Sequence, residues 1–177
     1  ADGRKKRVCT HIDLSWNKGR LALSEQLQSR YFSYKSSVGG QPLNAAGFAE
    51  LVRDVRNAVP DLEVVVDECL CEGHRVVTTC TVMGTLTRPL LGCPANDKIL
   101  AVAAISLWTF NSAGEIEDVS TLLDLENARL QLGLHSALGD GLGLDSVDVL
   151  ELGLAIQKRF GIKIDAEAKD TRTHFAN

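Results

Sequence analysis

Residues 62–86, LEVVVDECLCEGHRVVTTCTVMGTL, determine the fold class that we predict for this chain. Valine is frequent in the first half of the stretch, valine and threonine are frequent in the second, and β-branched side chains favour strands. Glu72-Gly73 separates the two halves and is typical of a hairpin turn. We therefore predict strands over 62–71 and 75–86. Two further strands are expected over 98–110 and 115–124, on either side of a turn at 111–114, which gives a four-strand antiparallel meander.

Helical patterns precede and follow this meander. Residues 4–30 are predicted to be helical, with a break at 16–19, and residues 31–34 to form a short strand. Asn44 suits the N-cap of a helix to Val59, whose apolar stripe is Phe48, Leu51, Val52, Val55 and Val59. A last helix is expected over 125–132, with Gly133 after its end. The predicted class is α+β, a curved antiparallel sheet with helices on one face that form a cone around an apolar cavity.

The composition excludes several classes of protein. With 177 residues, 45% of them hydrophobic, and a net charge of -4, the chain is neither largely disordered nor a strong nucleic-acid binder. Its longest apolar run, 99–108, is far shorter than the roughly 20 residues that span a membrane. No apolar segment follows the basic residues 4–7, so we expect no secretory signal and a cytoplasmic protein. The five cysteines contain no C-x-x-C pair and the histidines are scattered, so we predict no metal site.

Short segments distributed along residues 8–134 carry a family resemblance. They are Trp16-Asn17-Lys18-Gly19, Gly47-Phe48, Arg56-Asn57-Ala58-Val59-Pro60-Asp61-Leu62, Glu72-Gly73, Gly84-Thr85, Gly92-Cys93-Pro94, Gly114-Glu115-Ile116, Asp124 and Gln131-Leu132-Gly133. In this order and spacing they resemble the SnoaL-like polyketide cyclases, which share the cone of the nuclear-transport-factor-2-like fold. The resemblance implies an intramolecular aldol closure of a polyketide ester, with an acid/base side chain in the cavity and without a cofactor.

By the same resemblance, Asp124 matches the aspartate credited with proton transfer. A carboxylate in an apolar pocket suits the removal of a proton next to a carbonyl group. Alternation along the last strand places Asp118, Ser120 and Asp124 on one face, which is the cavity face if Ile116 points inward. The expected pocket residues are Trp16, Tyr34, Phe48, Ser106, Trp108 and Ser120.

The chain departs from the family at four positions where active members carry polar, basic or aromatic side chains. Leu86, Ser106, Leu107 and Ser120 stand at these positions. Two interpretations therefore stay open for the cone domain. It cyclises, isomerises or dehydrates its ligand with the help of Asp124, or it is a non-catalytic docking or dimerisation module in which Asp124 caps the following helix. A homodimer through the cone domain is a further expectation.

A second resemblance lies near the C-terminus. Residues 141–152, GLGLDSVDVLEL, and 158–165, KRFGIKID, together resemble the phosphopantetheine site of acyl carrier proteins. The resemblance implies that Ser146 carries 4′-phosphopantetheine and that Asp145 helps to hold magnesium while the arm is transferred from coenzyme A. A serine at the start of a helix suits this role, because the positive end of the helix dipole favours a phosphodiester.

The predicted organisation is a cone domain over residues 1–134 and a helical carrier region over 135–177. The 44 residues after Gly133 are too few for a complete carrier bundle, so we expect segments of the carrier to be missing. Whether the two parts are a natural fusion or an artificial join stays open. The expected partners are a phosphopantetheinyl transferase, polyketide or fatty-acid synthase enzymes, and the acyl or polyketide chain itself, without nucleic acid or a membrane.

Overall fold

The computed structural model describes residues 2–133. The elements in chain order are α1 (Asp2–Ile12), the π-helix η1 (Asp13–Asn17), α2 (Leu21–Glu25), β1 (Gln28–Ser36), α3 (Ala45–Ala58), β2 (Glu63–Glu72), β3 (Arg75–Thr85), β4 (Ile99–Phe110), β5 (Ile116–Leu123) and α4 (Leu125–Gln131). The mixed α+β class is confirmed. The four predicted meander strands agree with β2–β5 to within one residue at each end.

The sheet has five strands rather than four, in the order β1-β5-β4-β3-β2. Strand β1 begins at Gln28 and pairs with β5 in parallel, so the predictions of a wholly antiparallel sheet and of a helix to residue 30 are wrong. The physical reason is that Gln28, Ser29 and Arg30 have no strand pattern of their own. The start of β1 is instead set by the pairing of Gln28 with Ile116 of β5, a strand that lies far away in the sequence.

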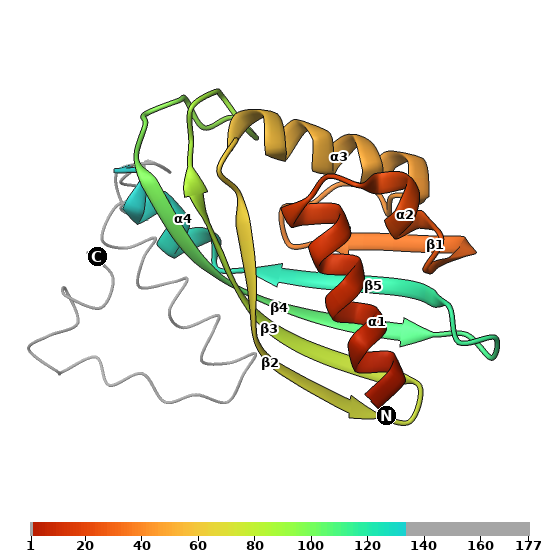
Figure 1. Ribbon diagram of the computed structural model, residues 1–177. Coiled ribbons are helices and arrows are strands. Elements are labelled where there is room, and N and C mark those ends of the chain that lie inside the picture. Colours follow the sequence, from red (N-terminus) through yellow and green to blue (C-terminus); the bar gives the residue numbers. More distant parts are fainter. Residues whose placement is uncertain (1, 134–177) are drawn as a thin grey trace, which may run out of the picture. The chain divides into compact units, whose positions relative to one another are not determined.

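Helices cover one face of the sheet. Figure 1 shows α1, α2 and α3 packed on the same side of the curved strands. The Asn44 side chain accepts a hydrogen bond from the Gly47 amide at 2.9 Å, which confirms the predicted N-cap of α3. Phe48 and Val52 are buried on the inner side of α3, as the predicted stripe requires. None of the described helices is long and apolar enough to cross a membrane.

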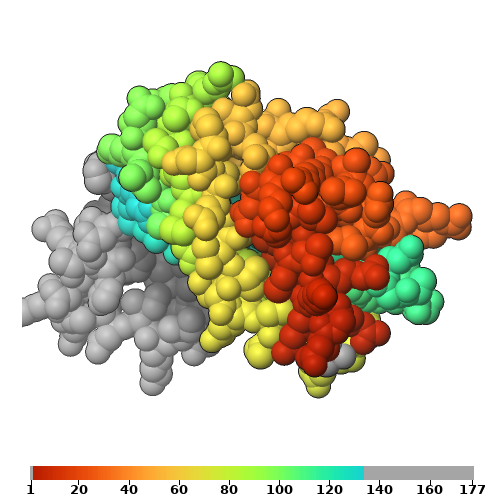
Figure 2. Space-filling view, viewed as in Figure 1, coloured from red at the N-terminus to blue at the C-terminus, as the bar shows by residue number. Residues whose placement is uncertain are grey.

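The break in the N-terminal helix is fixed by contacts with two other elements. The Arg56 guanidinium donates to the carbonyl oxygens of Trp16 and Asn17, at 2.6 and 2.8 Å. Gly19 follows in a left-handed conformation, with φ of 63°, and a Cβ atom there would lie 2.8 Å from Arg56 Nε. The Asn17 side chain pairs with both backbone groups of Val64 in β2, at 2.7 and 3.1 Å. In Figure 2 the red atoms of the N-terminal helices accordingly adjoin the yellow atoms of β2.

A β-bulge in β5 determines which of its side chains point inward. Phe110 pairs with Ile116 and Thr109 pairs with Asp118, so Glu117 is an extra residue in β5. Ile116 is buried before the bulge, and Val119 and Thr121 are buried after it. The alternation of inward and outward positions is therefore shifted by one residue within this strand.

Candidate functional site

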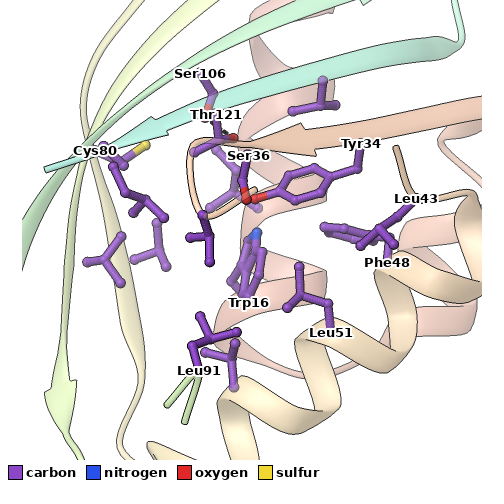
Figure 3. A pocket seen from close by; sticks show the side chains of 18 of the residues that line it. Trp16, Tyr34, Ser36, Leu43, Phe48, Leu51, Cys80, Leu91, Ser106 and Thr121 are labelled. Atoms are coloured by element: carbon purple, nitrogen blue, oxygen red, sulfur yellow. Dashed lines mark hydrogen bonds between the residues drawn. The ribbon is translucent and has the colours of Figure 1, made fainter. Parts of the chain in front are cut away.

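The helices and the inner face of the sheet enclose a cavity of about 390 Å³ (Figure 3). Its wall is made mainly of apolar side chains from α1, α3 and all five strands, among them Ile12, Leu51, Val55, Leu62, Val64, Val82, Ala104 and Leu123. None of the described residues that line it is Asp, Glu, Lys or Arg. A cavity of this size and lining suits a mostly apolar ligand with a few oxygen atoms.

Aromatic residues form one wall of the cavity. Phe48 from α3 is central, because its ring lies 5.6 Å from that of Trp16 and 5.0 Å from that of Tyr34. Trp108 from β4 is held by a 3.0 Å hydrogen bond from its indole N–H to the buried Thr78 hydroxyl. These contacts fix the rings, so the cavity exists without a ligand to shape it.

Three hydroxyl groups, from Tyr34, Ser106 and Thr121, lie in this apolar wall. Ser106 from β4 and Thr121 from β5 face each other across the ladder, with their oxygen atoms 2.8 Å apart. Burial raises the pKa of the Tyr34 phenol above its usual value, and the nearby Thr121 hydroxyl opposes this only in part. Tyr34 is therefore un-ionised at neutral pH and keeps its own hydrogen available for a ligand.

His11 on α1 is fully buried beside this cavity. Its ring packs against Phe32, Phe48 and Trp108, at centroid distances of 6.0, 5.5 and 5.5 Å. Its Nε2 atom lies 2.8 Å from Nε2 of Gln28. In the described part of the chain, His11 Nδ1 has no hydrogen-bond partner. Burial lowers the pKa of His11 to about 4, so the imidazole is neutral near pH 7 and a weak base.

Two loops form the mouth of the cavity. Residues 38–41 follow β1, and residues 90 and 91 belong to the segment between β3 and β4. Val38 and Leu91 both line the cavity and are exposed to solvent, which places them at its rim. Each of the two loops where a ligand would enter thus carries an exposed apolar side chain at the mouth.

The structure places five of the six expected pocket residues at the cavity. Trp16, Tyr34, Phe48, Ser106 and Trp108 all line it. Ser120 is exposed on the opposite face of β5 and does not.

Asp124 does not line the cavity either. It is exposed, and its carboxylate accepts a 3.1 Å hydrogen bond from the Asn127 amide at the start of α4. The expectation that Asp118, Ser120 and Asp124 face the cavity is therefore wrong. The cause is the bulge at Glu117, which shifts the alternation by one residue, so that Val119 and Thr121 face inward and Asp118 and Ser120 face outward.

The sequence analysis did not identify His11, Cys80 or Thr121 as cavity residues. His11 lies in a mainly polar segment, and its position became clear only when α1 was seen against Phe48. Thr121 lies between the apolar residues Val119 and Leu123, which also face inward after the bulge. Starting the alternation from Val119 instead of Ile116 would have identified it. Burial raises the pKa of the Cys80 thiol, so this residue is a neutral part of the wall.

Ser146 and Asp145, the expected attachment residues, lie outside the described residues. Between residues 2 and 133, no three His, Cys, Asp or Glu side chains come together in a way that could hold a metal ion.

Two family profiles match the chain. The profile of the SnoaL-like polyketide cyclases matches residues 6–132, and a phosphopantetheine attachment site profile matches residues 116–169. The second match includes Ser146 and implies a phosphopantetheine prosthetic group. It also overlaps β5 and α4, which lie within the residues that the cyclase profile matches. No curated protein gives a significant match.

Solved structures show the same fold. TsrD from Streptomyces laurentii has a TM-score of 0.68 at 20% identity, covering 76% of this chain and 98% of its own. AclR from Streptomyces galilaeus, provisionally assigned as a hydroxylase, has a TM-score of 0.65 at 18% sequence identity. The match covers 77% of this chain and 100% of AclR. IdmH from Streptomyces antibioticus, provisionally assigned as a polyketide cyclase, has a TM-score of 0.64 at 18% sequence identity. The match covers 73% of this chain and 98% of IdmH. At these identities the likeness establishes the fold alone.

Proposed function

Because the chain belongs to the SnoaL-like polyketide cyclase family, we propose that its cone domain folds a polyketide chain in the cavity and promotes its intramolecular aldol closure. Together, the cyclase profile and the phosphopantetheine attachment profile point to polyketide biosynthesis. The observation that carries the finer proposal is that the Tyr34, Thr121 and Ser106 hydroxyls line a cavity that is otherwise largely apolar.

This set of three hydroxyl side chains suits a ligand oxygen atom that becomes negatively charged during the reaction. Burial raises the pKa of the Tyr34 phenol, so its hydroxyl is neutral and keeps a hydrogen to donate. The Ser106 and Thr121 hydroxyls share a hydrogen bond with each other, which leaves the Tyr34 hydrogen for a ligand carbonyl. Hydrogen-bond donors that are already oriented stabilise developing charge strongly in an apolar site. We infer that Tyr34 binds the carbonyl oxygen that is attacked during ring closure.

The proton balance of this reaction needs no carboxylate in the wall. The enol form of a β-dicarbonyl unit supplies the nucleophilic carbon and releases its hydroxyl proton to solvent as the new carbon–carbon bond forms. The attacked carbonyl oxygen takes a proton from Tyr34, and the proton that the enol released to solvent returns through the mouth of the cavity to Tyr34, so no net proton is gained or lost. The cavity contributes orientation by enclosing the chain in a folded conformation.

The carrier region is proposed to hold the chain during this step. The chemistry of a serine hydroxyl fits attachment of the arm, and Ser146 lies within the matched attachment site. Ser146 would hold 4′-phosphopantetheine through a phosphodiester, with Asp145 supporting its transfer from coenzyme A, and the arm supplies a thiol for the acyl chain. A phosphopantetheinyl transferase and synthase enzymes are the partners that this role requires. Tethering raises the local concentration of the chain at the cavity.

Attachment is tested by labelling. The full chain is incubated with coenzyme A and a phosphopantetheinyl transferase, and its intact mass is measured. Ser146→Ala should abolish the mass increase, whereas Ser136→Ala, in the same region, should retain it. Labelling of S146A would refute the attachment residue.

Ring closure is tested on the chain loaded with a poly-β-keto thioester. Tyr34→Phe removes the donor but keeps the ring, and should lower the closure rate about 100-fold or more. Tyr31→Phe is the matched control, because Tyr31 is exposed and does not line the cavity. Equal closure rates for Y34F and the wild type would refute the proposed role of Tyr34. Binding without any closure in the wild type would refute the cyclase proposal itself.

A further inference from the structure

A tight turn at the mouth of the cavity holds a leucine in an unusual backbone conformation. Leu90 and Cys93 exchange two backbone hydrogen bonds, of 3.0 and 2.9 Å, around the central residues Leu91 and Gly92. Leu91 has φ of 50° and Gly92 has φ of 80°. Two central residues with positive φ are what a two-residue turn of type I′ requires.

Leucine is a poor choice for the first central position of such a turn. Asparagine, aspartate and glycine adopt positive φ at much lower cost, whereas a bulky side chain crowds the backbone. Asp97, the other described non-glycine residue with positive φ, at 52°, is one of these tolerant types. An unfavourable conformation that persists at a site calls for a reason outside the turn itself.

The position of the Leu91 side chain supplies that reason. Leu91 is 61% exposed, so burial in the core does not hold it in place, yet its side chain lines the cavity. In Figure 3 it projects toward the other lining side chains, on the side where Trp16 lies. An asparagine would fit the turn better but would place an amide at this apolar rim.

The base of the loop anchors the turn. The Thr87 amide donates to the Ala58 carbonyl at 2.8 Å, and the Arg88 guanidinium donates to the Asn57 side chain, also at 2.8 Å. Leu86 is buried and accepts hydrogen bonds from the amides of Asn96 and Asp97. The loop is thus attached to the C-terminal end of α3, which sets the place at which its tip meets the cavity.

We propose that Leu91 is a ligand-contacting residue that covers the acyl chain at the mouth of the cavity. It slows the departure of long apolar chains, and the unfavourable turn conformation is retained because it directs this side chain to the rim. The proposal rests on the proposed function only in that the cavity accepts an acyl chain as a thioester. It assigns no part of the ring closure to Leu91.

The test separates the side chain from the backbone conformation. The probe is decanoyl pantetheine, and its dissociation from the full chain is followed by tryptophan fluorescence in stopped-flow displacement, since Trp16 and Trp108 line the cavity. Leu91→Asn relieves the backbone and Leu91→Ala does not, while both remove the apolar contact. We expect both variants to release the probe about tenfold faster, the effect of losing part of one leucine contact. The urea midpoint of L91N should equal or exceed that of the wild type, and that of L91A should not exceed it.

Leu70→Asn is the matched control. Leu70 is 65% exposed on β2 and does not line the cavity, so L70N should release the probe at the wild-type rate. Wild-type dissociation rates in L91N and L91A would overturn the proposal. A lower urea midpoint in L91N would also overturn it, because Leu91 would then serve the fold.

The two proposals fail in different assays. If the wild type binds decanoyl pantetheine but closes no ring, the inference on Leu91 stands and the cyclase proposal falls. If the wild type does not bind the probe, the inference on Leu91 falls.

Discussion

Acidification from pH 7 to pH 5 should destabilise the cone domain through a single buried side chain, His11. Its pKa is lowered from 6.5 to about 4 by burial, because a charged imidazole among Phe32, Phe48 and Trp108 would lose its hydration. Between pH 6.5 and about pH 4, the unfolded chain binds a proton at His11 and the folded chain does not. Stability that is present above pH 6.5 is therefore lost progressively as the pH falls toward 4.

The expected loss follows from the two pKa values. At pH 5 the unfolded form is almost fully protonated at His11 and the folded form is still mostly neutral, so the free energy of unfolding falls by about 2 kcal/mol relative to pH 7. Ending the range at pH 5 limits the contribution of carboxylates. Asp61, for instance, has its pKa held below its usual value by hydrogen bonds from Thr85, so it stays ionised there.

The assay is urea unfolding of the full chain at pH 7 and pH 5, followed by tryptophan fluorescence. Both tryptophans of the chain, Trp16 and Trp108, line the cavity, so the signal reports on the cone domain. His11→Phe should abolish most of the pH dependence. The comparison uses the pH dependence rather than the absolute stability, because the substitution leaves Gln28 without its partner.

His74→Asn is the control, since His74 is exposed in the turn between β2 and β3. It should show the same loss between pH 7 and pH 5 as the wild type. An equal loss in H11F and the wild type, or no loss in the wild type, would refute the reasoning about buried His11.

Two further substitutions test the packing and the cap. Gly84→Ala should destabilise the cone domain by about 1–3 kcal/mol, because its Cβ atom would lie only 2.2 Å from Val59 Cγ1. The control in urea unfolding is Gly3→Ala, whose new Cβ atom would have no atom within 4 Å. An equal midpoint for both variants would contradict the prediction. Asp124→Ala should lower stability by about 1 kcal/mol through loss of the α4 cap while the affinity for decanoyl pantetheine stays the same; a loss of affinity without a loss of stability would instead give Asp124 a role at the ligand.

The meander could be predicted from the sequence because its signals are local. Valine and threonine in 62–86, the Glu72-Gly73 turn and the apolar run in β4 specify strands without reference to the rest of the chain. The N-cap at Asn44 and the stripe of α3 are local in the same sense. Strand β1 is the opposite case, because it is held by β5, with which Gln28 and residues 33–36 pair, and β5 lies far away in the sequence.

The sequence predicts an apolar cavity between the helices and the sheet, but it does not predict every side chain that lines the cavity. Trp16, Phe48 and Trp108 were among the expected pocket residues, and the structure places all three at the cavity. Because β5 contains one extra residue, Thr121 and Leu123 line the cavity in place of the expected Ser120 and Asp124. A bulge depends on how two strands fit together, and the sequence of β5 alone does not mark its position.

The overlap of the two family profiles can be resolved by the fold. Residues 116–132 fall in both matches, but they cannot be part of a sheet and part of a carrier bundle at once. In the structure Ile116 and Val119 are buried in the core, and Ile116–Leu123 pairs with β4 on one side and β1 on the other. Breaking these two ladders would expose the cavity wall, including Thr121. The shared residues therefore belong to the cone, and any carrier function must come from the chain beyond them.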